Sequence, residues 1–164
     1  TNITNEVKYL PGQKLFFTTI NYGDLIPLFK DKDLKKYHLP EKKPENSCAI
    51  LVTGIASPDS LKIFLEGYFE RVVHLRFPDH HYFSERDIKT IRSEWNNRGR
   101  GKKIIITTEK DGVRLREFTN IEDSFRKAFY YIPVEVGFLK DDKKKFDNLI
   151  FDYVGKNKRD KRIP

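Results

Sequence analysis

The stretch CAILV, residues 48–52, is apolar at every position, a pattern typical of a β-strand that is buried on both faces of a sheet. Three further segments rich in β-branched and aromatic residues follow it, at 72–75, 104–107 and 129–136. Between them lie segments with apolar residues at helical spacing. Strands that alternate with helices in this way predict a mostly parallel sheet, and Pro133 predicts an edge position for the last strand.

Helices are expected between and after these strands. Ser57 is placed to cap a helix that has Pro58 as its first residue, and Ser84 with Asp87 fits a capping box at the start of the next helix. Two more helices are expected, a short one at 108–115 and an amphipathic one at 146–155. The predicted fold class is therefore α/β, with a mostly parallel sheet and flanking helices in a Rossmann-like, three-layer arrangement.

Composition divides the chain into four parts. A strand is predicted at 14–20, because this segment is rich in aromatic and β-branched residues and follows a Pro-Gly turn signal. The next segment is dominated by Lys, Asp, Glu and Pro, which predicts a linker or exposed loop. The predicted parts are a strand segment at 1–29, a charged linker at 30–46, an α/β lobe at 47–155 and a loose basic tail at 156–164.

The bulk composition limits the class of protein. A chain of 164 residues is long enough for one domain with a sizeable core, and 32 Lys and Arg against 24 Asp and Glu favour anionic partners. The single cysteine, Cys48, excludes an internal disulfide and fits a reducing compartment. No run approaches the ~20 apolar residues of a membrane span. The sequence contains no methionine and begins with Thr1, so we expect a piece cut from a longer protein.

In parallel sheets the functional surface lies outside the carboxyl ends of the strands. This rule selects three loops, at 53–58, 77–84 and 107–111. In the first loop, backbone amides around Gly54 can face an anion at a helix start, with Thr53 and Ser57 as polar neighbours. A tight turn that needs a small residue explains Gly54 equally well. The sequence has no phosphate-binding loop of the G-x-x-x-x-G-K-[ST] type.

The second loop contains Asp79, His80 and His81. Two histidines beside a carboxylate can act as base and orienter or contribute to a metal site. Adjacent side chains point apart in extended backbone, so these three cannot all face one ligand without a turn. A surface pair without function is the alternative. No zinc site is expected, because only His38 and His74 remain as histidine ligands.

The third loop places two hydroxyls, two carboxylates and an ammonium in five residues: Thr107, Thr108, Glu109, Lys110 and Asp111. Thr108 is placed to cap the following helix, with Asp111 as its third residue. Contact with a ligand is an equal alternative, and both roles can hold together.

Four motifs occur in order and with plausible spacing: LVTGIASP (51–58), FPDHHYF (77–83), TTEKDGVRL (107–115) and YIPV (131–134). Together they resemble the C-terminal half of the tetraacyldisaccharide 4'-kinases, over about residues 14–154. Gly112 stands where a small residue such as alanine is expected.

This resemblance implies a kinase of lipopolysaccharide biosynthesis that transfers the γ-phosphate of ATP to the 4'-hydroxyl of the lipid A disaccharide 1-phosphate. It implies action at the cytoplasmic face of the inner membrane of Gram-negative bacteria. ATP and Mg²⁺ would bind mainly to an N-terminal lobe, and residues 14–20 would form one strand of the hinge to that lobe. The implied partners are the lipid A precursor and the N-terminal lobe. An anionic membrane surface is a further candidate, and nucleic acid is not expected.

The resemblance also makes His80 and Asp79 the candidate catalytic residues. His80 would activate an aspartate of the N-terminal lobe that takes the proton of the substrate hydroxyl, and Asp79 would be its neighbour. The chain alone is then expected to be inactive. Two other classes remain open: a metal-dependent phosphoesterase built on the Asp-His-His motif, and a non-catalytic basic module for RNA or an anionic membrane, suggested by the basic residues at 156–162.

Overall fold

The computed structural model describes residues 8, 10–99, 101–140 and 142–160. The chain divides into two compact units. One runs from Tyr22 to Val134, and the other consists of the segments up to Asn21 and from Glu135 onward.

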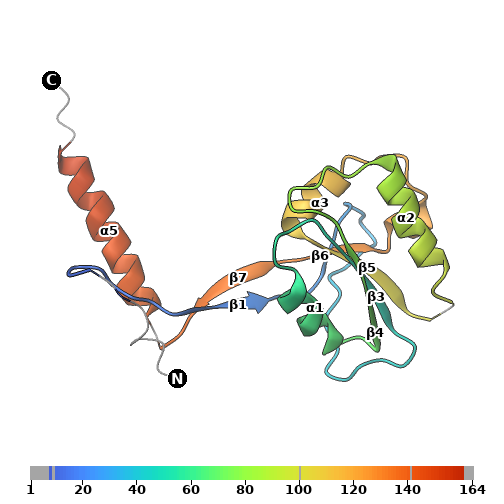
Figure 1. Cartoon of the computed structure of the whole chain (residues 1–164), viewed down its shortest axis with the longest axis horizontal. Coiled ribbons are helices and arrows are strands. Elements are labelled where there is room, and N and C mark those ends of the chain that lie inside the picture. The colour runs from blue at the N-terminus through green and yellow to red at the C-terminus, as the bar shows by residue number, and fades with distance from the viewer. Residues whose placement is uncertain (1–7, 9, 100, 141, 161–164) are drawn as a thin grey trace. The chain divides into compact units, whose positions relative to one another are not determined.

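The first unit is built on a five-stranded sheet in the order β2-β6-β5-β3-β4 (Figure 1). Neighbouring strands are parallel, except that β2 runs antiparallel to β6. The strands are β2 (Ile26–Pro27), β3 (Cys48–Thr53), β4 (Arg71–Arg76), β5 (Lys103–Thr108) and β6 (Phe129–Ile132). In the register of the central strands, Ile50 lies opposite Val73 on one side and Ile105 on the other. The predicted mostly parallel sheet is confirmed.

Helices cover both faces of this sheet, as Figure 1 shows for α1 and α2. The helices are α1 (Asp59–Glu66), α2 (Glu85–Asn96), α3 (Glu109–Leu115) and α4 (Asp123–Arg126). Ile50 and Val52 of β3 pack in one core with α2, whereas Ala49 and Leu51 pack in a second core with α1. Alternate residues of a strand face opposite sides of a sheet, so a strand that is apolar throughout supplies both cores. The three-layer prediction is confirmed.

The predicted helix starts have different outcomes. Ser84 caps α2, and the reciprocal capping box with Asp87 is present. Ser57 does not cap α1: the cap position is Pro58, without a side-chain hydrogen bond. The helix begins one residue later than predicted because the Pro58 carbonyl accepts the first helical hydrogen bond, from Lys62 N at 3.0 Å.

The predicted strand at 129–136 is two strands, β6 and β7 (Val134–Phe138), with Pro133 between them. β6 pairs with β5 and β2, so it is not at the edge of the sheet, and the prediction from Pro133 was wrong. Proline lacks only the N–H group. Because Pro133 lies between the two strands and accepts a hydrogen bond from Gly23 N at 3.1 Å, no ladder needs the missing donor.

The boundary between the compact units falls elsewhere than at the charged stretch 30–46. Leu25, Leu28 and Phe29 are buried in the cores of the first unit, and Tyr37 pairs with Leu25 in an isolated bridge. Apolar residues before and within the charged run thus tie this segment to the sheet.

The second unit contains most of β1 (Thr18–Tyr22) and β7, which pair in a two-stranded sheet, and α5 (Lys143–Asp160). Phe16, Phe138 and Phe146 form an aromatic cluster, with ring centroids 5.0 to 6.4 Å apart.

α5 continues through Gly155 to Asp160. The prediction that this helix stops near Gly155 and is followed by a loose tail was therefore wrong as far as Asp160. Gly155 does not adopt the left-handed conformation of a helix-ending glycine. The remainder of the predicted tail, 161–164, lies outside the described residues. Within the described part of the chain, no helix has the length and apolar character to cross a lipid bilayer.

Candidate functional site

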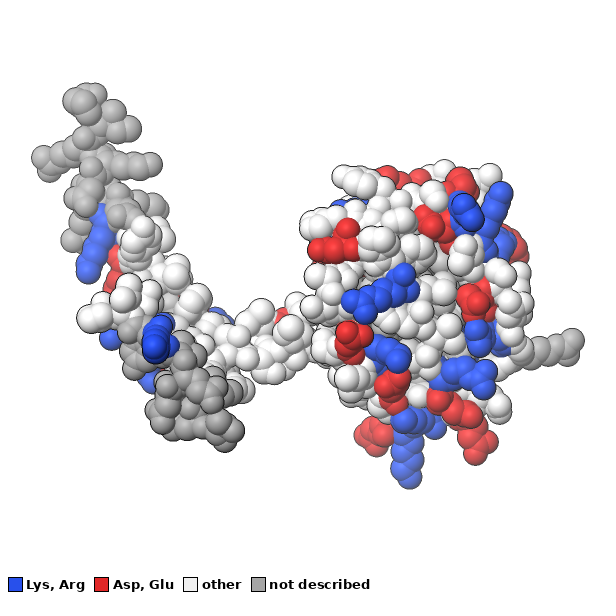
Figure 2. Space-filling model, in the orientation of Figure 1, with Lys and Arg blue, Asp and Glu red and all other residues white. Residues whose placement is uncertain are grey.

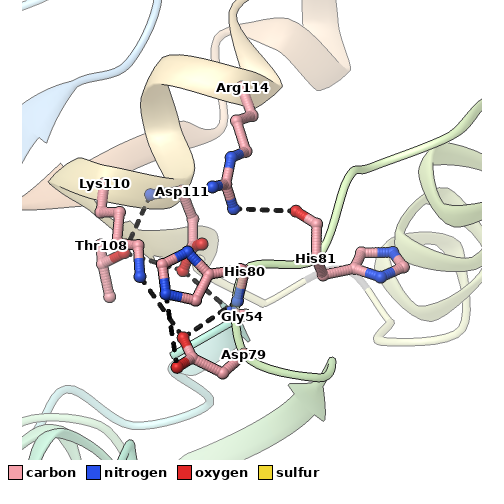
Figure 3. Close-up of polar contacts among 8 residues, drawn as sticks. All are labelled: Gly54, Asp79, His80, His81, Thr108, Lys110, Asp111 and Arg114. Carbon is pink, nitrogen blue, oxygen red and sulfur yellow. Dashed lines mark hydrogen bonds and ion pairs between the residues drawn. The ribbon is translucent and has the colours of Figure 1, made fainter. Parts of the chain in front are cut away.

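The three loops selected from the sequence lie together at the carboxyl edge of the sheet (Figure 3). They follow β3, β4 and β5, which are adjacent and parallel. Backbone and side-chain hydrogen bonds join them: His80 N donates to Gly54 O at 3.0 Å, and Gly54 N donates to Asp111 Oδ2 at 2.9 Å. Gly54 therefore forms one link between the second loop and the third.

Asp111 is the buried centre of the third loop. It is 0% exposed, and its Oδ2 accepts from both Gly54 N and the Thr108 hydroxyl, the latter at 2.8 Å. Thr108 caps α3 as predicted, because its Oγ1 accepts from Asp111 N at 3.1 Å. The other carboxylate oxygen, Oδ1, has no hydrogen-bond partner among the described residues. The first turn of α3 thus combines a cap with a buried carboxylate directed at another loop.

Close packing leaves little room for a side chain at Gly54. A Cβ atom at this position would lie 3.2 Å from Asp111 Oδ1, from His81 Cβ and from Pro78 O, closer than most side-chain contacts. Its N–H group is already bonded to Asp111, so this amide is not available to an anion. Of the two sequence interpretations of Gly54, the structure supports the tight turn. Ser57 is exposed.

His80 is presented to solvent by a strained backbone. Its φ angle is +60°, a left-handed conformation that is uncommon outside glycine, although histidine adopts it more readily than most residues. Its N–H donates both to Gly54 O and to Asp79 Oδ1, the latter at 2.9 Å. The imidazole is 69% exposed, with Nε2 3.7 Å from Asp79 Oδ2. The backbone of His80 is fixed while its ring remains accessible.

Asp79 is held as a carboxylate beside this histidine. Lys110 Nζ lies 3.3 Å from Asp79 Oδ1. Desolvation opposes ionisation, but the hydrogen bond from Lys110 and the positive charges of His80 and Lys110 outweigh it, so the pKa of Asp79 lies below its usual value. Asp79 therefore stays negatively charged over the neutral pH range.

His81 turns away from this group, as Figure 3 shows. Its Nε2 lies 3.0 Å from Asp87 Oδ2 in the cap of α2, and its ring stacks on Phe77 at a centroid distance of 4.8 Å. Its carbonyl accepts from Arg114 Nη1 at 3.0 Å. The turn separates the two histidines: His80 and Asp79 share one side, and His81 joins the loop to α2.

Thr53 and Thr107 are fully buried rather than presented at the site. Thr53 Oγ1 lies 2.8 Å from His74 Nε2, and burial together with nearby Arg76 lowers the pKa of His74. Glu109 is exposed. Among the residues for which the structure gives positions, no group of three or more His, Cys, Asp or Glu side chains is arranged to hold a metal ion.

Sequence reasoning predicted Asp87 only as part of a helix cap and did not select Arg114, although both hold this loop. Arg114 lies three residues after Asp111, a spacing that places two side chains on the same side of a helix. That spacing was the available signal.

The sequence profile described as tetraacyldisaccharide-1-P 4'-kinase matches residues 18–154, which is most of the chain. The chain belongs to this kinase family. The match contains all three loops and their strands.

Several relatives of this kinase family are similar over nearly the whole chain. The tetraacyldisaccharide 4'-kinase of Phocaeicola vulgatus is 40% identical over 157 residues, which cover 96% of this chain and 42% of the relative. That of Bacteroides thetaiotaomicron is 35% identical over 161 residues, with the same coverage of 96% and 42%. That of Flavobacterium psychrophilum is 37% identical over 141 residues, covering 86% and 36%. The chain thus spans about two fifths of the length of these curated relatives.

Among solved structures, the chain is similar to the "apo" form of LpxK from Aquifex aeolicus in complex with ATP. The TM-score is 0.45 at 15% identity, and the match covers 89% of this chain and 38% of that one.

Gly112, where the family resemblance leads us to expect a small residue, packs so closely that a Cβ would lie 2.7 Å from Leu28 Cδ1. On the face shown in Figure 2, Lys and Arg side chains of the first unit lie interspersed with Asp and Glu side chains. The net charge of +8 is not gathered into one basic patch on that face.

Proposed function

We propose that this chain is the C-terminal lobe of a kinase that transfers the γ-phosphate of ATP to the 4'-hydroxyl of the lipid A disaccharide 1-phosphate. Family membership supports the reaction, and the site supports a specific role for His80. One observation carries that role: the imidazole of His80 is accessible, whereas its backbone N–H is held by hydrogen bonds to Gly54 O and Asp79 Oδ1. Such a group is placed to meet a partner that lies outside this chain.

The proposed role of His80 is to orient and tune a carboxylate of the N-terminal lobe, which takes the proton of the attacking hydroxyl. An imidazole bonded to a carboxylate can set its orientation and its basicity. Asp79 is not free for this task, because its Oδ1 is bonded to His80 N and lies against Lys110. Its proposed part is to hold the His80 backbone and to place a negative charge beside the ring.

ATP and Mg²⁺ are proposed to bind in the part of the kinase that this chain does not include. The sequence contains no G-x-x-x-x-G-K-[ST] loop, and the described residues group no three metal-ligating side chains. The remaining partners are proposed on the same footing: the lipid A disaccharide precursor, the N-terminal lobe and an anionic membrane surface, at the cytoplasmic face of the inner membrane of a Gram-negative bacterium.

The test is a substitution of His80 in the full-length kinase. His80→Ala is expected to lower kcat by roughly 10²–10⁴-fold, the usual contribution of a group in acid–base catalysis, with an unchanged circular dichroism spectrum. The pH profile of kcat should also change, because the imidazole tunes the base.

The matched control is His38→Ala. This histidine is also exposed and also lies beside an aspartate, with its Nδ1 2.7 Å from Asp24 Oδ2, but it is not in the three loops. It should retain wild-type kcat. Full activity of His80→Ala, or equal losses in both variants, would contradict the assignment.

A further inference from the structure

We propose that Asp111 is a positioning residue for His80 and acts through Gly54. This inference rests on the proposed function of His80 and adds the device that holds it. Three features of the described residues carry it: the burial of Asp111, the two-sided clamp on Gly54, and the contacts that the first turns of α3 make around His80.

The first step is the clamp on Gly54. Its N–H donates to Asp111 Oδ2 at 2.9 Å, and its C=O accepts from His80 N at 3.0 Å. These groups flank one Cα atom, so a displacement of Asp111 moves the acceptor of the His80 amide. The absence of a Cβ lets Gly54 sit against Asp111 Oδ1 and the backbone of the His80 loop.

Helix α3 holds the loop around His80 at three consecutive residues, Asp79, His80 and His81. Lys110 contacts the Asp79 carboxylate, Asp111 reaches His80 N through Gly54, and Arg114 donates to the His81 carbonyl. The contacts differ in burial. Lys110 is 44% exposed at its side chain, whereas Asp111 is fully buried.

The third step is the strength of the buried contact. A hydrogen bond to a carboxylate strengthens in a low-dielectric interior, and its loss leaves the Gly54 N–H without an acceptor. Asp111 is also rigid, because Thr108 bonds both its amide and its carboxylate. We therefore assign the placement of His80 chiefly to Asp111.

The experiment is a double-mutant cycle in the full-length kinase with Asp111→Ala and His80→Ala. Asp111→Ala removes the acceptor of Gly54 N and is expected to lower kcat by about 10-fold to 100-fold, because a small displacement of a group that acts on the reaction is costly. KM for ATP should stay within about twofold. In the His80→Ala background, Asp111→Ala should change kcat by less than about twofold, because the two residues act as one unit.

A second measurement reads the backbone directly. Amide hydrogen exchange at Gly54 and His80, followed by NMR in this chain, should be faster in Asp111→Ala than in wild type. Leu61→Ala is the control for lost stability, because Leu61 is a residue of α1 that is buried in the core on the other face of the sheet. It should lower the melting temperature without changing kcat at the assay temperature or the order of exchange rates in the loop.

Two outcomes overturn the inference. One is an Asp111→Ala effect on kcat that multiplies with that of His80→Ala, which shows an independent role. The other is unchanged exchange at His80 in Asp111→Ala. If His80→Ala proves fully active, the proposed function of His80 fails, and the exchange measurement alone then decides whether Asp111 positions this loop.

Discussion

The helix starts that follow β4 and β5 carry the same four-residue pattern and use it differently. At Ser84, the contacts of the cap are local: Ser84 N donates to Asp87 Oδ2 at 2.8 Å, Ser84 Oγ accepts from Asp87 N, and Asp87 Oδ2 also contacts His81 Nε2 in the same loop. At Thr108, the hydroxyl caps the helix, but the carboxylate of Asp111 bonds Gly54, 57 residues away in the sequence. Asp87 is 17% exposed at its side chain, whereas Asp111 is fully buried. One local motif can thus end a helix or join two loops, and burial separates the two uses.

The largest expected difference between the two starts is in stability. Asp111→Ala should reduce the free energy of unfolding by roughly 3 kcal/mol, because it leaves the buried Gly54 N–H and Thr108 hydroxyl without their acceptor. Asp87→Ala should cost about 1 kcal/mol, the usual value for a helix cap. Urea denaturation followed by the fluorescence of Trp95, the single tryptophan, measures both. Equal losses would show that the burial of Asp111 has no consequence for stability.

A smaller difference is expected between the hydroxyls. Thr108→Val keeps the shape of the side chain but removes the acceptor of Asp111 N and the donor to Asp111 Oδ2, and we expect a loss of roughly 2 kcal/mol. Ser84→Ala should cost about 1 kcal/mol, because water can reach the exposed groups that it leaves unpaired. Thermal unfolding of both variants gives the ranking. A larger loss in Ser84→Ala would reverse the comparison.

The smallest effect is the pH dependence of the exposed cap. Desolvation opposes ionisation of Asp87, but hydrogen bonds from Ser84 and His81 outweigh it, so its pKa is lower in the folded state. The carboxylate therefore adds stability above the unfolded pKa of about 4, and this contribution is lost as the pH falls through the folded value. Asp87→Asn should flatten the acid side of the stability profile by less than about 1 kcal/mol. Denaturation midpoints between about pH 2 and pH 6 test this, and an unchanged slope would contradict it.

The sequence predicted those elements whose signals are local. The apolar run at 48–52 and the Ser84–Asp87 cap are complete within a few residues, and both were confirmed. β2 was missed because two residues, Ile26 and Pro27, carry no periodicity and form a strand only by pairing with β6. The end of α5 was placed too early because glycine lowers helix stability by only about 1 kcal/mol, which neighbouring residues can offset.

The candidate site was predicted in outline for the same reason. The strand-end rule selects loops, and the structure brings these loops together. The strand-end rule could not show that Thr53 would face inward to His74, or that His81 would turn to Asp87. Both contacts join residues on different elements, so they depend on the assembled fold and are not indicated by any periodic pattern in the sequence.

The left-handed backbone of His80 places two separate requirements on the residue at position 80, one on its backbone conformation and one on its side chain. Protein abundance depends on the φ angle, so glycine and asparagine should be tolerated there, whereas valine and isoleucine should not. In the proposed function, catalysis depends on the imidazole ring, which none of these four residues supplies. A scan of all substitutions at position 80 would therefore rank the amino acids in two different orders, depending on whether folded protein or phosphorylated lipid is counted.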